Sequence, residues 1–167
     1  RPLPNPYLYR DEPFNSTRFG MYLVTRLDGP TYEQAMEQAT MAKRVETAKS
    51  YAQERASQGR PIARLQAVQF MIAEAATRLE AARSLTYQAA SLADRGERIT
   101  EMAAQAKLFA SETAGFVASR CLQVHGGAGV MRDLHPVERY FRDARVLEII
   151  EGTSEIQKLV IAGSELR

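Results

Sequence analysis

Glu151 and three glycines, Gly126, Gly127 and Gly129, are the residues whose types and spacing most favour chemistry in this chain. The glycines permit positive φ and let a ligand approach the backbone closely. Glu151 precedes Gly152 in a short segment between helical patterns, where a carboxylate could take up a proton as a general base. On residue type alone, however, a glutamate near the start of a helix is better explained as a partner for the helix dipole.

The elements that must position these residues are helices. Apolar residues recur every three or four positions over residues 31–55, 62–94, 100–124 and 156–160. This spacing predicts four helices, each with one apolar stripe. The connections are short and no stripe can be buried on its own, so the sequence predicts an all-α protein, an antiparallel four-helix bundle.

Capping residues predict where these helices begin. Thr100 is the expected N-cap of the third helix, and Pro136 is the expected first residue of a short charged helix. Ser154, followed three residues later by Gln157, fits a capping box for the last helix. These boundaries place Glu151 in a tight turn just ahead of the last helix.

Several other polar residues are interpreted as structural. Arg139, Arg142 and Asp143 lie within a helical turn of one another, so we interpret them as a charge network rather than a catalytic site. Cys121 lies on the apolar face of the third helix, and we expect it in the core rather than acting as a nucleophile.

The first 30 residues differ in composition from the rest. They hold five of the seven prolines, whose spacing favours extended backbone. Residues 19–24 prefer a strand, but one short run without a partner cannot make a stable sheet. We therefore expect an irregular Pro-rich arm over residues 1–30 and a single helical domain over residues 31–167.

The overall composition excludes several classes of partner. Lys and Arg number 22 and Asp and Glu 20, so a net charge of +2 gives no electrostatic reason to expect nucleic acid or an anionic membrane. The single cysteine cannot form an intramolecular disulfide, and no apolar run is long enough to span a bilayer. We expect a protein of the cytoplasm or mitochondrial matrix that is not secreted. His125 and His135 lack further ligands at suitable spacing, so no metal site is expected.

Several motifs, in the same order, resemble the C-terminal signature of the acyl-CoA dehydrogenase family. They are Gln-x-x-Gly-Gly-x-Gly from Gln123, Pro-Val-Glu-Arg from Pro136, Arg-Asp-Ala from Arg142 and Glu-Gly-Thr-Ser-Glu-Ile-Gln from Glu151. The resemblance continues upstream through residues 55–62, 65–69 and 107–112, and covers roughly residues 31–167. Several spaced motifs in one order are far more specific than any one of them.

The resemblance implies that Glu151 is the base that removes the α-proton of an acyl-CoA thioester. A hydride leaves the β-carbon for FAD, which gives a trans-2-enoyl-CoA. Such a base must be desolvated for its basicity to rise, and Ile149 and Ile150 beside it are compatible with a water-poor pocket. Some members of the family carry the base at the start of the first helix instead. That position falls at Gly29 or Pro30 of this chain, which cannot act as a base, and the nearby Glu33 and Glu37 are the alternative candidates.

The resemblance also implies which residues contact FAD. Gln123, Gly126 and Gly127 correspond to a segment that approaches the FAD of a neighbouring subunit, and Thr153 and Glu155 to residues that reach the FAD of their own subunit. Thr153 has the alternative of being only a helix cap. The glycines do not form a Rossmann fingerprint, because they follow a predicted helix rather than a strand.

Arg55 resembles an arginine that meets the FAD pyrophosphate across a subunit interface, and its forked donors suit a diphosphate. The chain departs from the family at Gln58, where a phenylalanine is usual, so the flavin contact expected there is in doubt.

Complete members of the family carry an N-terminal helical domain and a middle β-domain ahead of this bundle. The expected partners are therefore acyl-CoA, other copies or a complementary chain that carries those domains, and an acceptor like the electron-transfer flavoprotein. Two alternatives remain open. One is a non-catalytic assembly module derived from the family, and the other is a related flavin acyl-CoA oxidase.

Overall fold

The computed structural model describes residues 41–167. The predicted arm of residues 1–30, the beginning of the first predicted helix, and the carboxylates Glu33 and Glu37 lie outside the described residues. In chain order the elements are α3 (Met41–Glu54), β1 (Ala56–Ser57), β2 (Arg60–Pro61), the 3-10 helix η2 (Ile62–Arg64), α4 (Gln66–Asp94), α5 (Thr100–His125), α6 (Gly127–Val130), α7 (Val137–Val146) and α8 (Ser154–Glu165).

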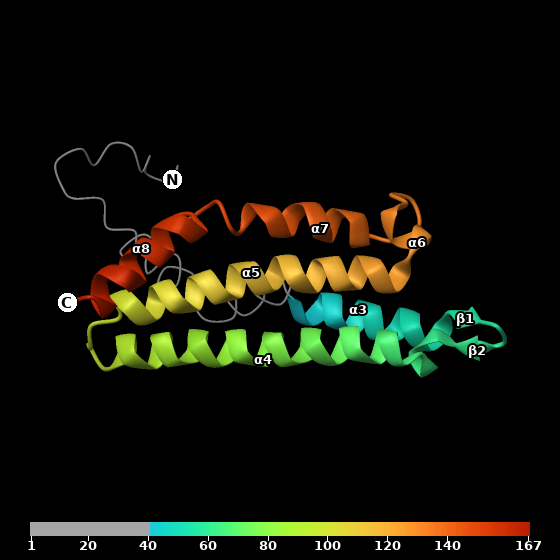
Figure 1. Ribbon diagram of the computed structural model, residues 1–167, viewed down its shortest axis with the longest axis horizontal. Helices are drawn as coiled ribbons and strands as arrows, with labels where there is room; N and C mark the ends of the chain where they lie inside the picture. The colour runs from blue at the N-terminus through green and yellow to red at the C-terminus, as the bar shows by residue number, and fades with distance from the viewer. Residues whose placement is uncertain (1–40) are drawn as a thin grey trace.

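The described helices form an antiparallel bundle (Figure 1). α3, α4 and α5 run along the long axis with reversals of direction between them, and α7 followed by α8 occupies the fourth position, antiparallel to α5. The all-α four-helix bundle predicted from the sequence is confirmed, with its fourth position made of two consecutive helices. None of the helices in residues 41–167 is long and apolar enough to cross a lipid bilayer.

Helix α5 is the centre of the bundle, because it packs against α3, α4, α6, α7 and α8. The buried face of this helix is broader than the predicted stripe, because Ala104, Ala114 and Ala118 beside that stripe are buried as well. Glu112, Ser119 and Gln123 stay exposed on the opposite face. A helix that packs against several neighbours needs a wide apolar face, and alanines let those neighbours approach closely.

The core consists of two clusters along the bundle. One joins α3, α4, α5 and α7 through residues that include Val45, Leu79, Val117 and Ala144, and the other includes Ala52, Val68, Cys121 and Val137. Cys121 is only 1% exposed, which confirms its predicted place in the core. Burial raises the pKa of its thiol to about 12.

A short hairpin with a two-residue loop joins α3 to η2, where the sequence predicts only a break between two helices. β1 and β2 pair antiparallel with Ser57 opposite Arg60, and the loop residues Gln58 and Gly59 have φ of 51° and 77°. Two consecutive positive φ values are typical of the tight hairpin turns that match strand twist. The hydrogen bond from Ile62 N to Arg55 O, 2.8 Å long, continues this pairing.

Three predicted helix starts are displaced by one residue. Thr100 is the first residue of α5 and Ile99 precedes it without a side-chain cap, whereas Pro136 is the N-cap of α7 rather than its first residue. Thr153, not Ser154, caps α8: its Oγ1 accepts a hydrogen bond from Ile156 N at 3.4 Å. Thr153 is the residue with extended backbone, as an N-cap requires, and this decides between two adjacent hydroxyl residues.

Candidate active site

The turn between α7 and α8 has an unusual backbone at Glu151 and Gly152. Their φ values are 58° and 87°, both in the left-handed region, which costs free energy for a residue with a side chain such as Glu151. Side chains from two helices hold this turn. Gln157 Nε2 of α8 donates to the carbonyl oxygens of Glu151 and Gly152 at 3.2 Å each, and Lys107 Nζ of α5 donates to Gly152 O at 2.7 Å.

The Glu151 carboxyl group is partly withdrawn from solvent. Its Oε2 atom is buried and has no hydrogen-bond partner among the described residues. Burial raises the pKa of Glu151 above its usual value, and the positive charge of Lys107 opposes that rise. A half-buried carboxyl group with a raised pKa and a free acceptor atom is suited to take up a proton from a ligand.

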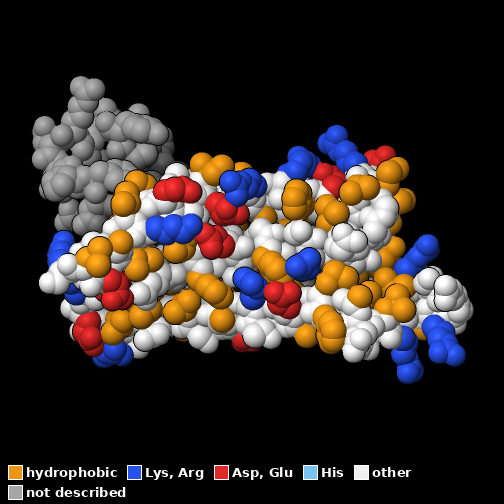
Figure 2. Space-filling model, in the orientation of Figure 1, with side chains coloured by type: hydrophobic (Ala, Val, Ile, Leu, Met, Phe, Trp, Pro, Cys, Tyr) orange, Lys and Arg blue, Asp and Glu red, His pale blue; other side chains and the backbone are white. Residues whose placement is uncertain are grey.

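The expectation that Ile149 and Ile150 help to dry this site is not met within the described chain. Their exposed fractions are 56% and 44%. They belong to a set of exposed large apolar residues that follows α6, α7 and α8 and also includes Val130, Met131, Leu134, Phe141, Val146 and Leu159. Figure 2 shows apolar side chains gathered in groups over these helices. Ile149 and Ile150 can therefore exclude water from Glu151 only if another surface covers them.

Thr153 and Glu155 lie just after Glu151, as the motif requires. The side chain of Thr153 is used as the cap of α8. Glu155 is exposed, and hydrogen bonds from its own backbone N–H and from the Thr153 hydroxyl lower the pKa of its carboxyl group. The two residues therefore form one hydrogen-bonded helix start beside Glu151.

The remaining predicted residues, Arg55, Gln123, Gly126 and Gly127, lie at the end of the bundle that carries the hairpin and α6 (Figure 1). Gly126 has φ of 56°, and a Cβ added at Gly126 or Gly127 would meet no atom within 4 Å. Gln123 and Arg55 are exposed, and the backbone of Arg55 is fixed by its N–H donating to Tyr51 O at 2.8 Å. Open backbone and an arginine at the same end of the bundle are groups that could bind the pyrophosphate of FAD.

The structure thus separates the predicted residues into two groups. One group surrounds Glu151 and the other lies beyond the far end of α7, a helix of 10 residues that runs between them. Ten helical residues span about 15 Å. The two groups of predicted site residues therefore lie apart along the bundle.

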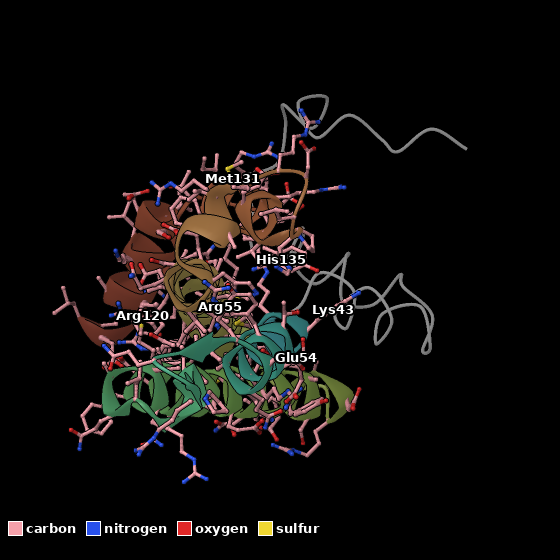
Figure 3. All side chains as sticks on the ribbon, turned by 90° about the vertical axis from the view of Figure 1, so that its right-hand side faces the viewer. Lys43, Glu54, Arg55, Arg120, Met131 and His135 are labelled. Carbon is pink, nitrogen blue, oxygen red and sulfur yellow. The ribbon has the colours of Figure 1, made fainter. Side chains whose placement is uncertain are left out.

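Aromatic rings that the sequence analysis did not group together pack beside the glycines. Tyr51 stacks on His125 with 4.1 Å between ring centroids, and His135 meets both rings edge-on. The His125 ring is 3% exposed, and its Nδ1 lies 2.8 Å from Cys121 O. Figure 3 looks onto this end of the bundle, and His135 and Arg55 lie near the centre of that view. No group of three potential metal ligands occurs in residues 41–167.

The charged residues of α7 pair with one another along their own helix. Arg139 Nε lies 3.3 Å from Asp143 Oδ2, and Arg142 Nε lies 2.8 Å from Glu138 Oε2. The predicted structural network is confirmed, although its arginines are exposed and such pairs contribute little to stability.

Lys107 and Gln157 are site residues to which the sequence analysis gave no role in the Glu151 turn. Lys107 is the first residue of one of the segments that resemble the family, and the sequence predicts that Gln157 belongs to a capping box. Gln157 is instead buried, and its amide reaches the carbonyls of the turn. Position in a family motif was the one available signal for both residues.

Comparisons with known proteins identify the family to which the chain is similar. The family model described as acyl-CoA dehydrogenase, C-terminal domain, matches residues 33–166. The mitochondrial short-chain specific acyl-CoA dehydrogenase of Bos taurus is 47% identical over 123 residues, which are 74% of this chain and 30% of that protein.

Solved structures give the same result. Butyryl-CoA dehydrogenase from Megasphaera elsdenii superposes with a TM-score of 0.74 at 36% identity, covering 76% of this chain and 33% of that one. An FAD complex of PigA has a TM-score of 0.72 at 31% identity, covering 75% of this chain and 32% of that one. The chain therefore spans about a third of the length of these proteins.

Proposed function

The chain belongs to the acyl-CoA dehydrogenase family, and we propose that it is the catalytic C-terminal domain of an FAD-dependent acyl-CoA dehydrogenase. The proposed reaction converts an acyl-CoA thioester to the trans-2-enoyl-CoA. The proposal rests on the Oε2 atom of Glu151, which is buried and has no hydrogen-bond partner among residues 41–167. Glu151 lies in a left-handed turn whose sequence matches the family motif.

In this reaction Glu151 accepts the α-proton of the thioester. Burial prepares the carboxylate for this role, because a less solvated carboxylate is a stronger base and its Oε2 atom has no competing donor among the described residues. When bound, FAD supplies the acceptor for the hydride that leaves the β-carbon. The proton on Glu151 and the hydride together account for the two hydrogens lost by the substrate.

Residues at both ends of α7 are the proposed contacts of FAD. Gly126 and Gly127 offer backbone that a ligand can approach without meeting a side chain, and Gln123 and Arg55 present exposed polar groups at the same end of the bundle. Near Glu151, Thr153 and Glu155 form the helix start that would face the FAD of the same subunit. The two groups are proposed to contact two different FAD molecules.

The proposal requires partners that complete the site. The exposed apolar residues along α6, α7 and α8 offer a surface that other copies, or a chain carrying the remaining domains, could cover. An acceptor like the electron-transfer flavoprotein would then reoxidise the flavin. The proposed compartment is the cytoplasm or the mitochondrial matrix, and the bovine relative is named as mitochondrial.

The decisive experiment is Glu151→Gln in the complete, flavin-containing assembly. The amide has nearly the same shape but cannot accept the α-proton, so reduction of the flavin by acyl-CoA should slow by about 100- to 10,000-fold. The loss of flavin absorbance is followed after rapid mixing with a panel of saturated acyl-CoA thioesters. Flavin content and melting temperature should stay close to those of the wild type.

Glu112→Gln is the matched control, because Glu112 is an exposed glutamate of α5 that pairs with Lys158 and not with the Glu151 turn. It should reduce the flavin at the wild-type rate. If Glu151→Gln kept full activity, or if the wild-type assembly held no flavin, the non-catalytic assembly module would be the better description.

A further inference from the structure

The left-handed turn at Glu151 needs bonds from outside the turn to persist. Glu151 pays a conformational cost at φ of 58°, and the next residue continues in the same region at 87°. Strained backbone of this kind survives only where surrounding groups fix it. The carbonyl oxygens of these two residues receive three side-chain hydrogen bonds, from one residue of α5 and one of α8.

We propose that Lys107 and Gln157 are positioning residues for Glu151, which hold its turn in the left-handed conformation, and that Lys107 also places a positive charge beside this turn, where it favours the ionised form of the Glu151 carboxyl group. This inference rests on the proposed role of Glu151 as the base. Neither residue needs to touch the substrate for the proposal to hold.

The position of Lys107 supports both parts of its role. Its Nζ atom reaches across 45 positions of sequence to Gly152 O at 2.7 Å, so the bond ties the central helix to the turn. Burial lowers the pKa of Lys107, and the negative charges of Glu151, Glu148 and Glu155, in that order, oppose this lowering. Glu148 is already paired with Arg145, and Glu155 is exposed. Glu151 is therefore the carboxylate on which the Lys107 charge acts most specifically.

Gln157 has a purely geometric role. The residue is 5% exposed, and its Nε2 atom bridges the two carbonyl oxygens at 3.2 Å each. A neutral amide fixes the turn without adding charge. Substitutions at Lys107 and Gln157 therefore distinguish the geometric contribution from the electrostatic one. Removal of either side chain loosens the turn, but only removal of Lys107 takes away a positive charge.

Four variants of the complete flavin-containing assembly test the proposal: Lys107→Met, Lys107→Arg, Gln157→Met and Lys158→Met. Lys158 is the matched control, because it also bridges α8 and α5, through an ion pair with Glu112 at 3.3 Å, but does not bind the turn. Each variant is measured for flavin content, for kcat and KM with an acyl-CoA thioester, and for the pH dependence of kcat/KM. The acid limb of that profile reports ionisation of the base.

Lys107→Met and Gln157→Met should each lower kcat by roughly tenfold or more, while KM stays within about twofold. The acid limb should move to higher pH in Lys107→Met alone, because loss of the nearby positive charge favours the protonated carboxyl group. Lys107→Arg should return the acid limb of the kcat/KM profile to its wild-type pH. Lys158→Met should have the same kcat, KM and acid limb as the wild type. A Lys107→Met limb that coincides with that of Lys158→Met would overturn the proposal, and so would a limb that moves equally in Gln157→Met.

A second readout does not depend on activity. Burial raises the pKa of Glu151, so its contribution to stability is present below the unfolded pKa and is lost as the pH rises through the folded pKa. Lys107→Met should enlarge this loss, so the variant should lose more melting temperature near pH 8 than near pH 5. In a Glu151→Gln background the difference between the two pH values should disappear.

The pH profile of kcat/KM and the melting temperatures distinguish a failure of the role proposed for Lys107 from a failure of Glu151 as the base. An equal loss of melting temperature at both pH values would refute the electrostatic role of Lys107 and leave only its hydrogen bond to Gly152 O. Activity that survives Glu151→Gln, together with a Lys107→Met loss that depends on pH, would refute Glu151 as the base and leave its charge interaction with Lys107 intact.

Discussion

Replacement of Gly129 by alanine tests whether the end of α5 packs as described. Gly129 is buried in α6, and an added Cβ would lie 2.8 Å from His125 Cβ and 2.8 Å from Leu122 O. Real Cβ atoms essentially never approach other atoms so closely, and one of the two obstacles is backbone that cannot rotate away. Either α6 must shift away from α5 or the Tyr51–His125 stack must open.

Overpacking of this kind typically costs about 1–3 kcal/mol. For a domain of 150–250 residues, each kcal/mol lowers the melting temperature by roughly 2–4 °C. We therefore expect Gly129→Ala to melt about 2–12 °C below the wild type, as measured by far-UV circular dichroism at fixed protein and flavin concentrations. Urea unfolding should give the same free-energy difference with an unchanged m-value.

Gly163→Ala is the matched control for helix propensity. Gly163 lies within α8, and an added Cβ there would meet nothing within 4 Å. Alanine should therefore stabilise the protein by about 0.5–1 kcal/mol. A Gly129→Ala protein at least as stable as the wild type, in the same experiment, would refute the close approach of α6 to α5.

Three further outcomes are expected. Gly127→Ala should fold with little change in melting temperature, since its Cβ faces open space, but should lower the flavin content after gel filtration if the proposed FAD contact is correct. Cys121, whose thiol pKa is raised to about 12 by burial, should resist a thiol reagent at pH 8 in the native protein and react fully after unfolding. Burial lowers the pKa of His125, so its contribution to stability is present above the ordinary histidine pKa and is lost as the pH falls through the folded value. His125→Asn should therefore flatten the decline in melting temperature between about pH 7 and pH 5.

Long regular patterns were predictable from the sequence. The apolar period predicts α4, and its end near Asp94 follows from the Arg95-Gly96 pair, where Gly96 has φ of 70°. Three helix starts were predicted one residue away from their positions; for α8 the reason is that Thr153 and Ser154 are both good caps and only backbone geometry distinguishes them. The second helix was predicted from residue 62, but α4 begins at Gln66 because residues 62–64 form the 3-10 helix η2.

Two kinds of feature were not predictable: a local turn with a weak sequence signal, and features that depend on distant contacts. The hairpin at Gln58 is of the first kind, because Gln-Gly is a weaker turn signal than Asn-Gly or Asp-Gly. The width of the buried face of α5 depends on which helices pack against it. The bond from Lys107 to Gly152 joins residues 45 positions apart, and no local pattern marks such a pair.

The central position of α5 has a consequence for how the two groups of site residues can change. This one helix holds Lys107 against the Glu151 turn and presents Gln123 at its other end, about 24 Å away at 1.5 Å per residue. Helices α3, α4, α6, α7 and α8 all pack against α5, and close packing resists a tilt of one end alone. Adaptation of either group, whether by natural variation or by engineering, must therefore keep the axis of α5 fixed, or it will shift the residues of the other group as well.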